Sequence, residues 1–138
     1  PILGICFGLH LGAHAYGVRV KHNPESTEWG KNLILNVAQD SDGIIGNGAK
    51  ILVEEKHKDF VMPDDRSFKG VFDVRAYTED RGLKYVQYAK HREKPLFLVQ
   101  FHPETSLEAI PEVRTPGEAI IQNFLRYAHR GLGIDSRV

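Results

Sequence analysis

The chain has 138 residues, and its 18 Lys and Arg balance its 18 Asp and Glu, so the formal net charge is zero at pH 7. This length allows one modest domain, and the balanced charge gives no broad positive field for nucleic acid or an anionic membrane. No apolar run approaches bilayer-spanning length, and no secretion signal is evident. The single cysteine has no intrachain disulfide partner and suits a reducing compartment, so we expect a cytoplasmic protein.

The first predicted elements are a strand, a tight turn and a helix, with a cysteine at the turn. Residues 1–3 lead into Gly4-Ile5-Cys6-Phe7-Gly8, and residues 9–16 have a helix-like pattern. In the serine version of this turn, G-x-S-x-G, glycines flank the nucleophile because the backbone is bent and crowded. The sulfur would lie near a helix N-terminus, whose N–H groups favour a thiolate. The pattern favours a nucleophile, although a lone cysteine after an apolar strand can also be a small buried hydrophobe.

The middle of the chain is predicted to consist of strands, loops and turns. We expect strands at 17–21, 32–37 and 49–55, a loop at 64–67, and an antiparallel hairpin of strands 71–77 and 83–89. The glycines between the second and third strands lack the Lys-Ser/Thr pair and following helix of a phosphate-binding loop, so they indicate turns. We expect no cofactor.

A second motif follows a buried strand near the end of the chain. Residues 95–101 are mostly apolar and lead into His102-Pro103-Glu104. Alternate residues of an extended segment share a face, so the imidazole and the carboxylate can lie together. A carboxylate beside an imidazole fixes its tautomer and stabilises its charged form, which suits a base acting on a thiol. Without Cys6, a solvated His and Glu would be the simpler interpretation.

A closing helix is predicted from its N-terminal signals. Thr115 is a plausible N-cap, Pro116 suits the first turn, and apolar residues then recur at helical spacing. Glycines at 131 and 133 are expected to end the helix, leaving a loose tail. The sequence thus predicts a domain over 1–130 and a tail over 131–138.

Together, Gly4-Ile5-Cys6-Phe7-Gly8 and Val99-Gln100-Phe101-His102-Pro103-Glu104 resemble the class I (triad-type) glutamine amidotransferases. The likeness is nearest to the glutaminase subunits of GMP synthetase and anthranilate synthase. The resemblance implies an α/β, flavodoxin-like fold: the C-terminal part of a doubly wound, mainly parallel sheet, with a nucleophile elbow and an antiparallel hairpin. In the family roughly half a domain precedes the nucleophile strand, so the N-terminal strands are expected to be absent here.

The resemblance also implies a reaction and a partner. Cys6 would attack the side-chain amide of glutamine, His102 would act as base and acid, and Glu104 would orient His102. Ammonia released through a thioester would pass to a synthase domain or subunit. The Phe7 backbone N–H would be one oxyanion donor. Gly8, His10 and His57 would lie at the oxyanion and substrate site.

Three departures from the family pattern bear on activity. His10 stands where the family has a substrate-binding glutamine, and Lys56 stands where a weaker S-H-x-D-x-V match around His57 has serine. A glycine-rich loop that supplies the second oxyanion donor lies N-terminal to the nucleophile strand in the family. Without that donor we expect a rate lower by about 10²–10³-fold.

Two other functions stay open, whereas a metal site is not favoured. The same triad occurs in a related peptidase of γ-glutamyl bonds, and the fold could serve as a non-catalytic interaction subunit. Cys6, His10 and His14 stand at four-residue spacings, which permits a metal site to be drawn. The turn after Cys6 breaks the helical phase and no fourth ligand is evident, so we expect no metal.

Overall fold

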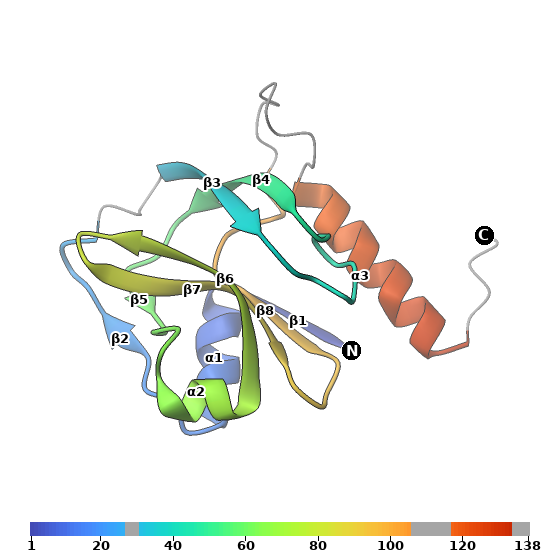
Figure 1. Ribbon diagram of the computed structural model, residues 1–138, viewed down its shortest axis with the longest axis horizontal. Helices are drawn as coiled ribbons and strands as arrows, with labels where there is room; N and C mark the ends of the chain where they lie inside the picture. Colours follow the sequence, from blue (N-terminus) through green and yellow to red (C-terminus); the bar gives the residue numbers. More distant parts are fainter. Residues whose placement is uncertain (27–30, 106–116, 134–138) are drawn as a thin grey trace.

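The structure is a computed structural model, and it describes residues 1–26, 31–105 and 117–133. A four-stranded sheet in the order β1-β8-β7-β6 forms its centre, and the other described strands form the two-stranded sheets β2-β5 and β3-β4 (Figure 1). The elements in chain order are β1 (Ile2–Ile5), α1 (Phe7–Ala15), β2 (Lys21–His22), β3 (Lys31–Val37), β4 (Ala49–Glu55), β5 (Asp59–Phe60), α2 (Arg66–Val71), β6 (Phe72–Asp80), β7 (Leu83–His91), β8 (Leu96–Val99) and α3 (Gly117–Gly131).

The central sheet mixes parallel and antiparallel pairs. Strand β1 pairs in parallel with β8, so that Ile5 lies opposite Val99, whereas β8 pairs antiparallel with β7 and β7 with β6. Among the described strands, parallel pairing is therefore confined to β1 and β8, and β1 forms one edge of the sheet. The carboxyl ends of two parallel strands meet at the same end of a sheet, which brings the two sequence motifs together.

The predicted hairpin is confirmed, with longer strands than expected. Two residues join β6 to β7, and both have positive φ: 50° at Arg81 and 80° at Gly82. Positive φ at both central residues is the type I′ turn, whose twist matches that of the flanking strands.

Apolar side chains cover the central sheet on both faces. Because side chains alternate along a strand, Phe97 and Val99 of β8 enter one core while Leu98 enters the other. One core gathers side chains from β3, β4 and α3, and the other from α1 and α2, on opposite sides of the sheet (Figure 1). Strand β8 is thus buried on both faces, as expected for the strand leading to His102.

Two sequence predictions in the middle of the chain were wrong. No strand forms over 17–20 in the structure; β2 is only Lys21–His22, held by pairing with β5. The predicted loop at 64–67 contains the start of α2. Its N-cap Asp65 accepts a hydrogen bond from the backbone N–H of Phe68 at 2.9 Å, and the Phe68 side chain is fully buried. Tertiary burial makes a helix of a segment too short to show a helical period.

The other predicted elements are confirmed within the described residues. Strands β3 and β4 pair antiparallel where strands were expected, and α3 supplies the closing helix. The expected Thr115 cap and the last five residues of the tail lie outside the described residues, so the division at 130/131 stays a prediction. Within the described ranges, no helix is both long and apolar enough to cross a membrane.

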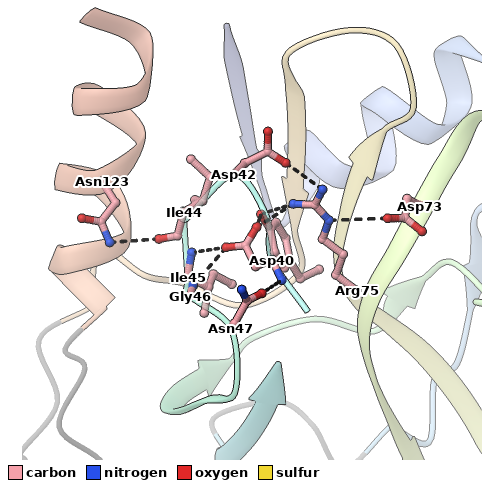
Figure 2. Close-up of polar contacts among 10 residues, drawn as sticks. Asp40, Asp42, Ile44, Ile45, Gly46, Asn47, Asp73, Arg75 and Asn123 are labelled. Atoms are coloured by element: carbon pink, nitrogen blue, oxygen red, sulfur yellow. Dashed lines mark hydrogen bonds and ion pairs between the residues drawn. The ribbon is translucent and has the colours of Figure 1, made fainter. Parts of the chain in front are cut away.

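The loop between β3 and β4 is organised around a buried carboxylate. Asp40 accepts hydrogen bonds on one oxygen from the backbone N–H groups of Ile45 at 2.6 Å and Gly46 at 3.0 Å. Its other oxygen accepts from the Arg75 guanidinium at 2.6 Å and the Tyr88 hydroxyl at 2.9 Å (Figure 2). Backbone donors of the loop and side chains of β6 and β7 therefore share one acceptor.

Arg75 extends this cluster toward the protein surface. Its Nη2 donates to Asp42 at 2.7 Å, and its Nε lies 3.6 Å from Asp73, a more exposed carboxylate. Burial alone would lower the pKa of Arg75, but its hydrogen bonds and charge contacts with Asp42, Tyr88 and Asp40 raise it. Burial and the charge of Asp40 raise the pKa of Tyr88, so its hydroxyl keeps its proton.

Candidate active site

Cys6 lies at a strained turn between β1 and α1. Its backbone has φ 51° and ψ −100°, a conformation that non-glycine residues rarely adopt, while its N–H donates to the carbonyl of Val99 at 2.8 Å. A Cβ at Gly4 would come within 2.8 Å of the Gly8 carbonyl oxygen. The sequence prediction of a bent, crowded turn is therefore confirmed on the side of Gly4.

Crowding does not explain the second glycine of the motif. A Cβ built on Gly8 meets no atom within 4 Å in the described structure, and its φ is not positive. The expectation that backbone crowding requires glycine on both sides of Cys6 was wrong at this position. The bend at Cys6 is tight only where β1 and the start of α1 approach each other.

His102 and Glu104 follow β8 at the same end of the sheet as Cys6. The prediction of an extended segment was wrong here, because residues 103 and 104 form a turn in which the Thr105 backbone N–H donates to the His102 carbonyl at 3.2 Å. His102 Nδ1 lies 2.5 Å from Glu104 Oε1, and the His102 backbone N–H donates to the Glu54 carbonyl at 3.2 Å. At Gly117, the first residue of α3, a Cβ would lie 2.4 Å from the Pro103 carbonyl oxygen. The close approach of α3 and the bond to β4 thus position the segment that carries the imidazole and the carboxylate.

The sulfur of Cys6 contacts Gln100 and Lys56. Gln100 Nε2 donates to Sγ at 3.6 Å, and Sγ lies 3.9 Å from the Lys56 carbonyl oxygen. Neither of these hydrogen bonds involves His102, whose ring is hydrogen-bonded to Glu104. The structure therefore brings Cys6, His102 and Glu104 to one end of the sheet, with the His102–Glu104 hydrogen bond formed.

The thiol of Cys6 is half-buried, and its surroundings favour the protonated form. Burial raises its pKa, and the charges of Glu55 and Glu104 raise it further. The Phe7 backbone N–H and the Gln100 amide act in the opposite direction, as hydrogen bonds to a thiolate do. The N–H at the helix N-terminus thus stabilises the thiolate, as expected from the sequence, but desolvation raises the pKa by more than this N–H lowers it.

A buried acid–imidazole pair lies next to this sulfur. His57 Nε2 is 2.5 Å from Glu55 Oε2, and its Nδ1 is 2.9 Å from the Asp59 carbonyl oxygen. The second Glu55 oxygen, Oε1, is buried with no hydrogen-bond donor among the described residues. Both nitrogens of His57 therefore have partners within the protein, and the pair holds the segment that passes over Cys6.

His10 is buried in α1 and contacts Gln100. Its Nε2 lies 2.9 Å from Gln100 Oε1, and burial lowers the pKa of the imidazole. The Phe7 side chain is exposed, while its backbone N–H acts to lower the pKa of Cys6. His10, at the position of the family's glutamine, is thus linked to the Cys6 sulfur through the Gln100 side chain.

Gln100, Glu55 and Lys56 lie near the Cys6 sulfur, and none of them was predicted there from the sequence. Gln100 could have been found, because it directly follows the strand paired with β1 and precedes His102 by two residues. Glu55 and Lys56 come from β4 and the residue after it, and no local pattern places that segment over Cys6.

The metal site drawn on Cys6, His10 and His14 is a separate question. Within the described residues no group of three or more His, Cys, Asp or Glu side chains could hold a metal.

Comparison with known proteins gives a consistent family. The sequence matches the family "Glutamine amidotransferase class-I" over residues 1–126. It is 32% identical over 125 residues to anthranilate synthase component 2 of Haloferax volcanii, covering 91% of this chain and 55% of that protein. It is 35% identical over 127 residues to the glutamine-hydrolysing GMP synthase subunit of Methanobrevibacter smithii, covering 90% and 57%. The chain thus spans somewhat over half the length of these curated relatives.

The fold comparison agrees. The crystal structure of a protein described as a GMP synthase subunit, from Thermoplasma acidophilum, superposes with a TM-score of 0.70 at 26% identity, covering 96% of this chain and 60% of that one. The strand–turn–helix at Cys6 and the strand that leads to His102 therefore lie in the fold that their sequence motifs predicted. On the family match over residues 1–126, the chain belongs to the class I glutamine amidotransferase family.

Proposed function

We propose that this chain carries the glutamine-hydrolysing centre of an amidotransferase, with Cys6 as nucleophile, His102 as base and acid, and Glu104 orienting His102. The observation that carries the proposal is the pairing of β1 with β8. This pairing lies beside the strained Cys6 turn and leads the chain to His102 and Glu104. His102 Nδ1 and Glu104 Oε1 are 2.5 Å apart. A nucleophile, a base and an orienting carboxylate are the groups that acyl transfer through a thioester requires.

In the proposed reaction His102 takes the thiol proton, and the Cys6 sulfur attacks the amide carbon of glutamine. The carbon–nitrogen bond breaks as His102 returns that proton to the leaving nitrogen, which gives ammonia and a thioester. Water then attacks the thioester, His102 passes one water proton to the sulfur, and glutamate leaves. The Phe7 N–H, which already favours the Cys6 thiolate, would donate to the oxyanion, with Gly8 next to it.

His10 and His57 have supporting roles in this proposal. His57, bonded at both nitrogens, would hold residues 55–59 over the substrate rather than bind glutamine directly. His10 contacts Gln100 and would shape the floor of the same pocket. The ammonia would pass to a synthase domain or subunit, and a free thiol nucleophile suits the reducing cytoplasm.

The proposal is tested with a glutamine analogue that carries an electrophile in place of the side-chain amide. We expect stoichiometric labelling of Cys6, slowed by excess glutamine, and slow ammonia release that falls at least about 10³-fold in Cys6→Ala. Folded protein that gives neither glutamine-protected labelling nor Cys6-dependent ammonia would indicate a non-catalytic member of the family.

The position of His10 makes a γ-glutamyl peptide the second substrate to test. Because an imidazole cannot offer both functions of an amide, contacts to the substrate side chain can differ from the family pattern. We expect glutamine to be hydrolysed faster than γ-glutamyl dipeptides. Faster cleavage of the dipeptides would instead assign the chain to peptide hydrolysis with the same triad.

A further inference from the structure

Two buried side chains, His10 and Gln100, connect helix α1 to the sulfur of Cys6. Gln100 is fully buried and bridges His10 Nε2, 2.9 Å from its Oε1, and Cys6 Sγ, 3.6 Å from its Nε2. His10 is itself only 7% exposed. Both side chains are therefore enclosed by protein, and their positions are not set by solvent.

The chemistry of the two groups gives the chain of hydrogen bonds a direction. An amide oxygen can only accept, so Nε2 of a neutral His10 carries the proton and donates to Gln100 Oε1. This fixes the Gln100 side chain with its NH₂ group toward the sulfur. Hydrogen bonds in such a chain polarise each other, so the His10 bond strengthens the donor that faces Cys6.

We propose that Gln100 is a positioning residue that donates to the Cys6 thiolate, and that His10 holds its amide in the donating orientation. The inference rests on the proposed function, because it matters for catalysis only if Cys6 is the nucleophile. The hydrogen bond from Gln100 offsets part of the free-energy cost of burying the charged sulfur. A hydrogen bond to an ionised group stabilises that form more than the neutral one.

The charged groups around the sulfur explain why such a donor is needed. Glu55 and Glu104 both raise the pKa of Cys6, and burial raises it most. Near His10, Asp59 favours and His57 disfavours a charged ring, but burial dominates and keeps the imidazole neutral. The Phe7 N–H and the Gln100 amide are thus the donors that oppose a negative, partly desolvated environment.

The decisive experiment measures the rate of Cys6 alkylation by iodoacetamide between pH 6 and 11 on the 138-residue chain. Cys6 is the single cysteine, so the label reports on this sulfur alone. In Gln100→Leu we expect the rate at pH 7 to fall about tenfold, with the plateau at high pH unchanged, because only the thiolate population changes.

Two variants at His10 test the same hydrogen bonds without changing the buried residue Gln100. In His10→Gln the amide nitrogen takes the place of Nε2, so we expect the wild-type profile. In His10→Asn the shorter amide cannot reach Gln100, and we expect the rate at pH 7 to fall about threefold. Circular dichroism and thermal unfolding verify that each variant is folded.

The proposed relay from His10 through Gln100 to Cys6 is refuted if folded Gln100→Leu alkylates with the wild-type profile, or if His10→Asn and His10→Gln behave alike. A purely structural role would lower thermal stability without moving the pH profile, which also refutes it. The readout does not require glutamine hydrolysis. A protein with the expected profiles but no Cys6-dependent ammonia would therefore retain the relay and lose the proposed function.

Discussion

Two buried acidic clusters of this protein differ in how completely their oxygens are bonded. At Asp40, four donors from the backbone and from Arg75 and Tyr88 share the two carboxylate oxygens (Figure 2). At Glu55, one oxygen meets His57 and the other is buried without a donor among the described residues. Both carboxylates are at most 2% exposed.

The two carboxylates also differ in what they contact, because Asp40 joins a loop to the central sheet whereas Glu55 raises the pKa of Cys6. A buried carboxylate with every oxygen bonded stabilises the fold around it, here the loop between β3 and β4. An incompletely bonded carboxylate beside a thiol costs stability and changes the electrostatics of that thiol instead. Replacing each acid with its amide, which has nearly the same shape, tests this distinction directly.

The largest effect is expected for Asp40→Asn. The amide nitrogen would face either two backbone N–H groups or the Arg75 guanidinium and the Tyr88 hydroxyl, so donors would oppose donors. We expect a loss of about 3–5 kcal/mol in the free energy of unfolding, measured by urea denaturation.

Asp73→Asn is the matched control for this change. Its carboxylate is half-exposed, with 56% of the side chain accessible, and lies 3.6 Å from Arg75. Exposed pairs contribute little, so we expect a change of less than about 1 kcal/mol. Equal losses in the two variants would contradict the assignment of Asp40 as the centre of the cluster.

A smaller change in stability is expected for Glu55→Gln. The amide can donate to His57 Nε2 while Nδ1 keeps its bond to the Asp59 carbonyl, so the pair stays bonded without charge. We expect the free energy of unfolding to change by less than about 1 kcal/mol.

The same variant should increase thiol reactivity. Removing a negative charge that raises the pKa of Cys6 should speed alkylation at pH 7 by about two- to fivefold. Glu93→Gln, an equal charge change at an exposed residue, should leave the rate unchanged. A slower thiol in Glu55→Gln would show that this carboxylate does not oppose the thiolate.

The smallest effect concerns the pH dependence of stability at His10. Burial lowers the pKa of His10 in the folded protein below its ordinary value of 6.5. Its stabilising contribution is then complete above pH 6.5 and is lost as the pH falls below that value, where the unfolded chain binds the proton first.

Urea denaturation of wild type and His10→Gln at pH 7 and pH 5 checks this sign. The wild type should lose more stability on acidification than the variant. His91, whose pKa burial also lowers, is present in both proteins, so its contribution cancels in the difference. Parallel losses would mean that His10 accepts a proton in the folded protein as readily as in the unfolded chain.

Sequence patterns located the two ends of the site because their signals are local. The turn with Cys6 between glycines and the Arg81-Gly82 turn both depend on neighbours along the chain. The closeness of His102 and Glu104 was also predicted, but from an extended segment, whereas the chain turns at residues 103 and 104. The helix at 66–71 was missed because its stability comes from burying Phe68, not from helical periodicity.

The α/β class, the turn at Cys6 and the family were all predictable from the sequence, since these follow from backbone preferences and short motifs. The surroundings of the sulfur were not predictable in this way: Gln100 donates to it, the Lys56 carbonyl lies 3.9 Å from it, and the charge of Glu55 acts on it. These groups come from segments more than 40 residues away in the chain. Their approach depends on strand pairing and burial, which no local pattern encodes.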